Sequence, residues 1–436
     1  MSRFLMTLAL VGVSAMAQAN GASTNRVPLM NPVVAWNRIL LSIVRTPGAQ
    51  SPTIHPTRSF AILHAAIYDA VNAIDQTHAV YKVSVPGASH RASQDAAATS
   101  AAHDVLVALY PAFTSTCDAA LQRSMADDAG GGDQGEGIRI GRAVAAQILA
   151  LRGRDGSTAQ PGAYVFGTAP RDYQSTPPNF PPQPQFTHWA FVTPFALEHA
   201  GQFRPEPPPS LASGQYADAL NEVEAVGVAN STDATPDEAL TGLFWNGPIQ
   251  NYWNEIAQTA ALSRHMSTAG SARLFALMNL SLADGVIAFY NAKYTYNLWR
   301  PVTAIQAADI DYNPDTLADP GWLPQSGRTA ADPSYPGAHA VISAAAADVL
   351  ASVVKRDRFT FDVTSETTPG IVRSFTSFSS AAEEASLSRI FAGQHFRFDE
   401  TAGQRLGREI ADFVVDHVLT RIDSKHDRQG PPRPGS

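Results

Sequence analysis

The chain has 436 residues, of which 44% are hydrophobic and 16% are charged. This composition excludes an intrinsically disordered protein, and the length suits one large domain or two packed domains. The formal net charge of −8 excludes a broadly basic surface for nucleic acid or for an anionic membrane. A phosphate-like ligand would therefore depend on a local cluster of basic residues.

Residues 1–19 have the layout of a secretory signal peptide. Arg3 supplies a short positive segment, residues 4–17 are apolar, and Ala17-Gln18-Ala19 fits a small-x-small cleavage site. The apolar run is too short to span a membrane, and we expect no membrane span later in the chain. A buried N-terminal helix is the alternative interpretation. The sequence thus predicts a secreted or periplasmic protein.

Residues 20–152 are predicted to form an N-terminal helical region. Apolar residues recur there at helical spacing in four segments: 36–44, 59–74, 93–109 and 137–151. His64 and Asp69 lie in the second segment, where a packing or hydrogen-bonding role is the simpler interpretation of both. Cys117 is the only cysteine, so an intrachain disulfide is excluded, and we expect it to be a small buried apolar residue.

The amino-acid composition changes over residues 153–210, which are rich in proline. Clustered prolines, at 177–184 and at 207–209, forbid a continuous helix. Aromatic residues are interleaved among them, which is unusual for a solvated linker. We therefore predict an irregular arm that packs over the body and rims a pocket, with Trp189 and Phe191 as its anchors.

Residues 211–423 are predicted to form the helical core that holds the site, followed by a polar tail at 424–436. The expected helices are 217–224, 248–264, 271–298, 338–354, 381–390 and 401–422. Alternating strand patterns are scarce, and 359–363 is the best candidate. The predicted fold class is all-α, with helical bundles around a C-terminal core.

Three segments of this core concentrate basic residues. In the first, Lys293 and Arg300 are seven residues apart, which would place them on one helical face, and Pro301 is expected to end that helix. An ammonium and a planar guanidinium aimed in one direction suit a tetrahedral oxyanion. A pair of solvated basic residues is the alternative when the segment is taken alone.

The second segment is Tyr335-Pro336-Gly337-Ala338-His339, which leads into an Ala-rich helix. The free N–H groups and the positive dipole end of a helix N-terminus attract anions. His339 would lie in the first turn, where it can exchange a proton with a bound anion. Alone, the segment equally fits an ordinary helix start.

The third segment runs from Ser388 to Asp399. His395 and Asp399 are four apart, so the carboxylate can orient the imidazole. Arg389 and His395 are six apart and would diverge on a straight helix. Gly393 offers the break that lets both side chains converge.

Together the three segments resemble the active-site pattern shared by vanadium-dependent haloperoxidases and type 2 phosphatidic acid phosphatases. That pattern is Lys-x6-Arg-Pro, then Pro-Ser-Gly-His, then Ser-Arg-x5-His-x3-Asp. The first and third segments match it in full. The second departs from it, because Gly337 stands for the usual Ser and Ala338 for the usual Gly. The helical segments upstream, including Phe244-Trp245 and Trp253-Asn254-Glu255, also look like those of secreted bacterial haloperoxidase-like proteins, which have a helical core.

The resemblance implies a role for each catalytic residue. His395 would bond the vanadium of vanadate or, in a phosphatase, act as the nucleophile that forms a phosphohistidine. Asp399 would hold the His395 ring. His339 would be the general acid-base.

The resemblance also implies the residues that hold the oxyanion. Lys293, Arg300 and Arg389 would neutralise its oxygens, and Gly337 and Ala338 would lie at the helix N-terminus beneath it. Gly337 has no hydroxyl to donate, so its backbone N–H or a water would have to substitute.

The first functional interpretation is a vanadium-dependent haloperoxidase that uses hydrogen peroxide, a halide and an organic acceptor, with vanadate as the cofactor. The second is a secreted acid phosphatase that acts on phosphate esters and needs no cofactor. The third is a non-catalytic oxyanion-binding helical protein. No nucleic-acid partner is expected. The sequence leaves the halide, the organic substrate and the oligomeric state open.

Overall fold

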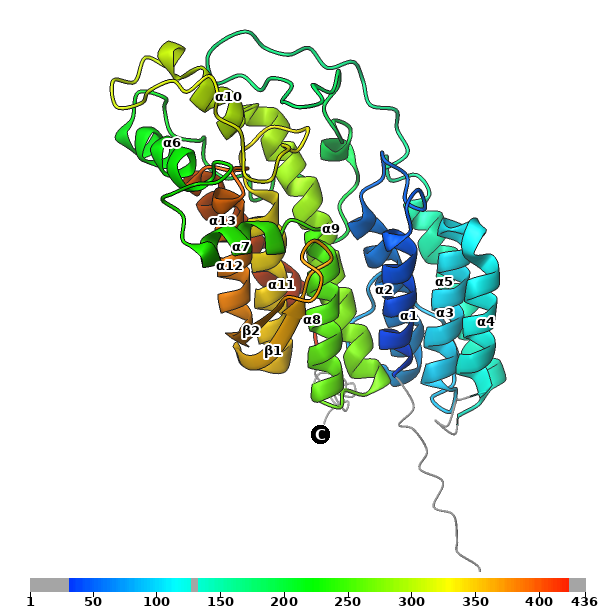
Figure 1. The fold of residues 1–436 in the computed structure, drawn as a ribbon. Coiled ribbons are helices and arrows are strands. Elements are labelled where there is room, and N and C mark those ends of the chain that lie inside the picture. Colours follow the sequence, from blue (N-terminus) through cyan, green and yellow to red (C-terminus); the bar gives the residue numbers. More distant parts are fainter. Residues whose placement is uncertain (1–30, 127–131, 423–436) are drawn as a thin grey trace, which may run out of the picture. The chain divides into compact units, whose positions relative to one another are not determined.

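The computed structural model describes residues 31–126 and 132–422. The predicted signal peptide and the predicted polar tail lie outside the described residues. Within the described part of the chain there are thirteen α-helices and one two-stranded sheet (Figure 1). The predicted all-α fold class is confirmed.

Five helices precede the arm. They are α1 (Pro32–Arg45), α2 (Pro56–Asp75), α3 (Gln94–Leu109), α4 (Thr114–Ala126) and α5 (Gln134–Arg152). Helix α4 was not predicted, because only Cys117 and Ala120 of its residues are buried and no apolar stripe marks it. Cys117 is a buried free cysteine, as predicted. Asp69 on α2 accepts hydrogen bonds from the backbone N–H groups of Tyr81, Lys82 and Val83, which is the polar structural role expected of it.

Eight helices follow the arm. They are α6 (Gly214–Val226), α7 (Pro236–Phe244), α8 (Ile249–Ser263), α9 (Thr268–Tyr296), α10 (Pro301–Gln306), α11 (Ala338–Val354), α12 (Phe378–Phe391) and α13 (Arg397–His417). Helices α7 and α10 were not predicted, since nine and six residues are too few for an apolar period to stand out.

Helix α9 is the central helix of this core. It is long and apolar enough to cross a membrane, contrary to the expectation that no later segment of the chain has this character. Its apolar window is 94% buried by the surrounding protein, which is the pattern of a core helix. It packs against α2 and against α11 and α13.

A hairpin interrupts the helices after α11. The predicted strand is confirmed as β1 (Arg358–Thr364), and it pairs antiparallel with β2 (Val372–Ser377), which was not predicted. Phe361 and Phe375 face each other in register and are buried in the main core. The hairpin thereby covers core residues beside α12.

The arm is irregular, as predicted, apart from a short 3-10 turn at Trp189–Phe191. Trp189 is buried as expected, but Phe191 is 83% exposed, so its predicted role as an anchor is wrong. Positions two apart in a 3-10 turn point to different sides, so one turn cannot bury both rings.

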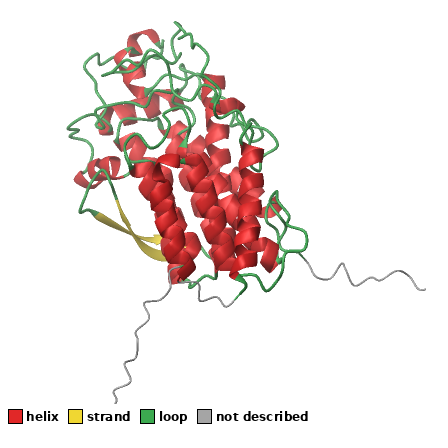
Figure 2. Ribbon diagram, turned by 90° about the vertical axis from the view of Figure 1, so that its right-hand side faces the viewer, coloured by secondary structure: helices red, strands yellow, loops and turns green. Residues whose placement is uncertain are grey.

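A second anchor of the arm comes from the core. The buried carboxylate of Asp284 on α9 accepts the backbone N–H groups of Phe195, Ala196 and Leu197 at 2.6, 2.7 and 2.8 Å. Further along, the Gln185 N–H donates to the Ala331 carbonyl. Figure 2 shows the irregular segments gathered at one end of the helices.

Candidate active site

Lys293 and Arg300 do not share one helix, and this corrects the sequence prediction. Helix α9 ends at Tyr296, because Asn297 adopts a left-handed conformation with φ of 56°. Arg300 is the N-cap of α10, so Pro301 begins a helix instead of ending one. Proline suits this first position because its missing N–H would have no partner there. Both basic side chains nevertheless enter the same buried site.

The second segment forms the predicted helix start. Gly337 is the N-cap of α11, and no side chain caps it. His339 lies in the first turn, as predicted. Helix α13 approaches closely here, since a Cβ on Gly403 would lie 2.5 Å from the Gly337 carbonyl oxygen. This close packing brings the start of α13 against the start of α11.

The third segment breaks where Gly393 was expected to break it. Helix α12 ends at Phe391, Gly393 has a φ of +72°, and α13 begins at Arg397. His395 thus lies between two helices. Asp399 is in the first turn of α13, and its Oδ2 is 3.0 Å from His395 Nδ1, so the predicted pair forms without a continuous helix.

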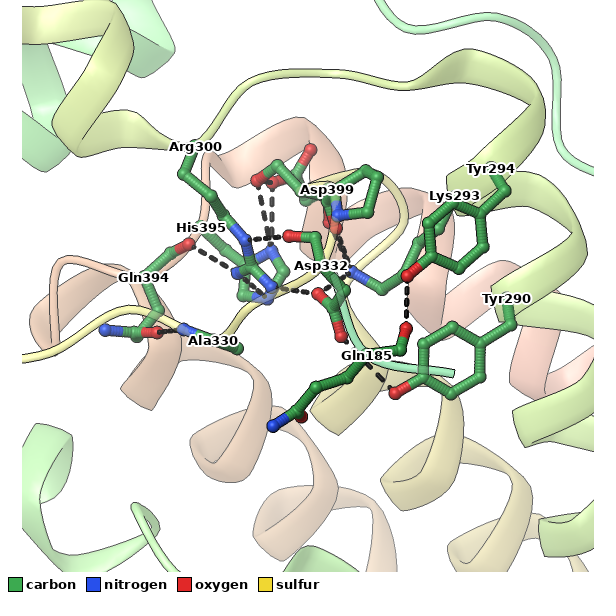
Figure 3. Close-up of polar contacts among 12 residues, drawn as sticks. Gln185, Tyr290, Lys293, Tyr294, Arg300, Ala330, Asp332, Gln394, His395 and Asp399 are labelled. Carbon is green, nitrogen blue, oxygen red and sulfur yellow. Dashed lines mark hydrogen bonds and ion pairs between the residues drawn. The ribbon is translucent and has the colours of Figure 1, made fainter. Parts of the chain in front are cut away.

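His395 and Arg300 meet directly at the centre of the site. The Arg300 Nη1–H donates to Nε2 of His395 at 3.0 Å (Figure 3). A guanidinium only donates, so Nε2 must carry a lone pair, and the ring proton must be on Nδ1, where it is donated to Asp399. Burial lowers the pKa of His395 well below its usual value, and nearby Arg300 and Lys293 lower it further. The imidazole is therefore neutral, with an unprotonated Nε2.

Three donors hold one oxygen of Asp399. Besides the imidazole N–H, the Ser334 hydroxyl donates to Oδ2 at 2.5 Å and the Phe396 backbone N–H donates to it at 3.1 Å. The other oxygen, Oδ1, is buried and has no hydrogen-bond partner among the described residues. Burial raises the pKa of Asp399 to about 6. This arrangement fixes the ring and the tautomer of His395.

Asp332 compensates two of the cations, although the sequence did not single it out. Its Oδ1 pairs with the Arg300 guanidinium and lies 3.2 Å from Lys293 Nζ (Figure 3). Burial alone would raise the pKa of Asp332, but Lys293 and Arg300 outweigh burial and lower it. Burial lowers the pKa of Lys293 to about 8. The ammonium also donates to the backbone carbonyls of Pro333 and Ser334.

His339 and Arg389 lie on the accessible side of the site. A cavity of about 420 Å³ between the arm and the loop at 328–331 reaches both side chains. His339 Nε2 is 3.0 Å from the Trp245 carbonyl, which can only accept, so Nε2 carries the proton and Nδ1 has a lone pair. Burial, and then the charge of Arg389, lower the pKa of His339 well below its usual value. The ring is thus a neutral base.

Arg389 has spare hydrogen-bonding capacity. One Nη donates to the Asn246 side chain at 3.3 Å, while Nε is buried without a partner among the described residues. A buried guanidinium N–H without an acceptor is costly. Such a donor fits the oxygen of a bound anion.

Glu400 fills the space that a side chain at position 337 would need. A Cβ on Gly337 would lie 2.1 Å from Glu400 Oε1. The Gly337 N–H is also engaged, since it donates to the Asp399 carbonyl at 2.9 Å. Of the two substitutes expected for the missing serine hydroxyl, the N–H is therefore wrong, and a water stays a prediction. Ala338 is the next residue, and the N–H groups of a first helical turn have no intrahelical partner.

The sequence interpretation thus missed two acids and one hydroxyl group of the site. Asp332, Ser334 and Glu400 are all buried beside the predicted residues. One signal was present, because three buried cations require compensating carboxylates, and Glu400 directly follows Asp399.

The donor set fits an oxyanion better than a metal cation. Among the described residues, no group of three or more His, Cys, Asp or Glu side chains is placed to hold a metal ion. A tetrahedral oxyanion would instead meet the unpartnered Arg389 Nε, the Lys293 ammonium and the Arg300 guanidinium. Binding at His395 Nε2 requires the Arg300 guanidinium to move from Nε2 to the oxygens of the anion.

Comparisons with known proteins point to one group of enzymes. Residues 273–424 match the family described as the VCPO second helical-bundle domain. The chain is 28% identical to the vanadium chloroperoxidase of Curvularia inaequalis, over 86% of this chain and 80% of that enzyme.

Solved structures agree in fold. The first bacterial vanadium-dependent iodoperoxidase superposes with a TM-score of 0.74 at 26% identity, covering 90% of this chain and 97% of that one. A holo-type bacterial vanadium-dependent chloroperoxidase superposes with a TM-score of 0.62 at 17% identity, covering 87% and 96%. At 17% identity, the similarity to the bacterial chloroperoxidase supports the fold alone.

Proposed function

Because this chain belongs to the vanadium haloperoxidase and type 2 phosphatidic acid phosphatase superfamily, we propose that it is a vanadium-dependent haloperoxidase. Such an enzyme oxidises a halide with hydrogen peroxide. One observation carries the proposal. The buried, neutral His395 offers a lone pair on Nε2 within a cluster of three cations, which is what a histidine-bound oxyanion requires.

In the proposed site, His395 Nε2 would hold vanadate, and Arg300 and Arg389 would donate to its oxygens. Lys293, whose three N–H groups already meet Asp332 and two backbone carbonyls, would contribute its positive charge. Asp399 keeps the imidazole proton on Nδ1, so that Nε2 remains a ligand. The N–H of Ala338 adds a donor at the positive end of α11. Bound vanadate supplies the Lewis acidity that makes hydrogen peroxide reactive toward halide.

His339 is the proposed acid-base residue. Its Nδ1 lone pair would accept a proton from hydrogen peroxide, and the imidazolium would return that proton to the oxygen that departs as water. Burial, and then the fixed charge of Arg389, disfavour the imidazolium, which favours return of the proton. The cavity beside the arm gives peroxide and halide a route to this residue.

The test is made on the full mature chain, freed of bound anions and then supplied with orthovanadate. Peroxide-dependent halogenation of monochlorodimedone is measured with chloride, bromide and iodide in turn. We expect turnover that depends on both vanadate and peroxide, and its complete loss in His395→Ala. His417→Ala removes an exposed histidine from α13 and serves as the matched control, with activity retained.

The same sample is assayed for hydrolysis of p-nitrophenyl phosphate. A neutral His395 Nε2 is also a competent nucleophile toward phosphorus, so the phosphatase alternative uses the same lone pair. Hydrolysis inhibited by vanadate, without halogenation of any halide, would overturn the haloperoxidase proposal in favour of the phosphatase. A folded protein without either activity would leave a non-catalytic oxyanion-binding protein.

A further inference from the structure

We propose that Arg328 recruits the anions on which the site acts, so that halide ions and oxyanions enter the cavity of the active site in preference to neutral molecules. The inference rests on the proposed function and names the residue that favours an anionic substrate at the entrance. Arg328 lies outside the three sequence segments that carry the superfamily pattern.

The cavity beside the arm carries positive charge without an acid on its wall. Its lining includes two arginines, Arg328 and Arg389, and no aspartate or glutamate. Three other cavities in the described part of the chain are each lined by as many acidic side chains as arginines. The whole chain has a net charge of −8, so this entrance is positive on a protein whose net charge is negative.

The two arginines differ in depth. Arg389 is buried, whereas Arg328 is exposed on the loop at 328–331 that forms one wall of the cavity. Burial lowers the pKa of Arg389 to about 10; Glu400 opposes this lowering, and Arg300 and Arg328 add to it. The charge of Arg328 thus acts inside the cavity. Arg328 forms no ion pair with a described residue, so its charge remains available to an entering anion.

Hydrogen bonds hold the loop that carries Arg328 against the active site. The buried side chain of Gln394 donates to the Arg328 carbonyl and, at 2.5 Å, to the Ser326 hydroxyl. Its Oε1 accepts the Ala330 backbone N–H at 3.4 Å (Figure 3). Gln394 directly precedes His395 in the chain. The backbone of Arg328 is therefore fixed to the segment that carries the central histidine, and its charge lies at the entrance of that site.

A charge at this position acts on anions before they bind. Dissolved salt screens it over about 8 Å at physiological ionic strength and over about 3 Å at 1 M. A cation on the wall of a cavity therefore raises the local concentration of halide at low salt but not at high salt. Hydrogen peroxide carries no charge, so Arg328 should leave its entry unchanged. Two substrates of one enzyme should thus respond differently, which a general loss of structure cannot produce.

The first experiment measures iodide oxidation by the full mature chain supplied with orthovanadate, at about 20 mM and at about 1 M ionic strength. At low salt, Arg328→Gln should lower kcat/KM for iodide about threefold and Arg328→Glu about tenfold, with kcat/KM for hydrogen peroxide unchanged. Arg328→Lys keeps the charge and should keep the wild-type value. At high salt the variants should become equal to the wild type.

The second experiment is calorimetry of the same variants, without vanadate, using inorganic phosphate, and it needs no turnover. Hydrogen phosphate carries two charges, so Arg328→Gln should weaken its binding about fivefold at low salt and not at 1 M. Arg356→Gln is the matched control, with phosphate binding retained. Arg356 is an exposed arginine beyond the far end of α11, about 25 Å from the start of that helix.

Equal losses of kcat/KM for iodide and hydrogen peroxide, or losses that persist at 1 M salt, would overturn the recruiting role. Unchanged phosphate affinity of Arg328→Gln at low salt would overturn it as well. If the wild-type chain oxidises no iodide but shows the salt-dependent effect of Arg328 on phosphate, the proposed function fails and the anion entrance stands. If the wild-type chain does not bind phosphate at all, both proposals fail.

Discussion

Replacing Asp399 by Asn should weaken the site far less than replacing it by Ala. The reason lies in the donors around Oδ2. The Ser334 hydroxyl and the Phe396 N–H both point at this oxygen, and a backbone N–H can only donate. The amide oxygen of Asn must therefore take the place of Oδ2, where it still accepts the His395 Nδ1–H. The required tautomer survives, and only the negative charge is lost.

The magnitude follows from the type of hydrogen bond. A bond to a charged acceptor contributes about 1.5–3 kcal/mol and a neutral one about 0.5–1.5 kcal/mol, so Asp399→Asn should weaken vanadate binding about tenfold. Asp399→Ala leaves three donors without an acceptor, at about 1–3 kcal/mol each, and frees the ring to rotate. We expect a loss of more than about a thousandfold from Asp399→Ala.

The assay is the vanadate dissociation constant of both variants, combined with ¹⁵N spectra of selectively labelled histidine. The His395 signal is identified by its absence in His395→Ala. The reasoning is refuted if the two variants lose the same affinity, or if the Asn variant shows its ring proton on Nε2.

Three further predictions concern other parts of the chain. Gly337→Ser should weaken phosphate binding about tenfold, because the serine Cβ would lie 2.1 Å from Glu400 Oε1. Combining Gly337→Ser with Glu400→Ala should restore the binding. Tighter phosphate binding by Gly337→Ser alone, measured by calorimetry, would contradict this prediction. Asp284→Ala leaves three buried N–H groups of the arm without their acceptor and should cost about 3 kcal/mol or more in the free energy of unfolding, with faster proteolysis near residues 195–197; an unchanged digestion pattern would count against the anchor. Burial lowers the pKa of His64 to about 3. Below the ordinary pKa of 6.5 the unfolded chain therefore binds a proton at this residue, whereas the folded chain does not. The stability that is present above pH 6.5 is lost as the pH falls. Between about pH 6 and pH 4 the wild type should lose about 1.4 kcal/mol per pH unit relative to His64→Gln in urea unfolding, and parallel pH profiles would refute this.

Helices with a clear apolar period and a clear start were predictable from the sequence. Helix α11 occupies residues 338–354 as predicted, because the Pro336-Gly337 turn marks its start and its residues are almost all apolar. Helix α4 has no such stripe, since it lies at the edge of the body with few buried residues. Local pattern therefore predicts helices that fill the core better than helices that cover it.

Arg300 shows why spacing alone misplaces a residue. A separation of seven residues between Lys293 and Arg300 is compatible with one straight helix. It is equally compatible with a helix that ends between them and a second helix that starts at Arg300. The left-handed conformation of Asn297 ends the first helix. Asparagine tolerates this conformation, but its presence in a sequence does not by itself predict a helix end. The side chain still reaches the site, because the turn redirects it.

Two acids of the site, Asp332 and Glu400, could not be derived from the spacing of residues, whereas Asp399 could. The Asp332 contact to Arg300 joins residues 32 apart, and the Ser334 contact to Asp399 joins residues 65 apart. Such pairs depend on how the loop before α11 packs against the starts of α10 and α13. The basic residues and Asp399 were found because they follow a recognisable pattern, whereas the placement of Asp332 and Glu400 follows from electrostatics in the folded chain.

Stoichiometric vanadate binding by His395 tests the central claim most directly. Calorimetry with orthovanadate should give one bound anion per chain, with binding lost in His395→Ala. His339→Ala should bind vanadate nearly as well as the wild type, because this residue is proposed to move protons and not to hold the anion. Equal binding by the wild type and His395→Ala would contradict the account.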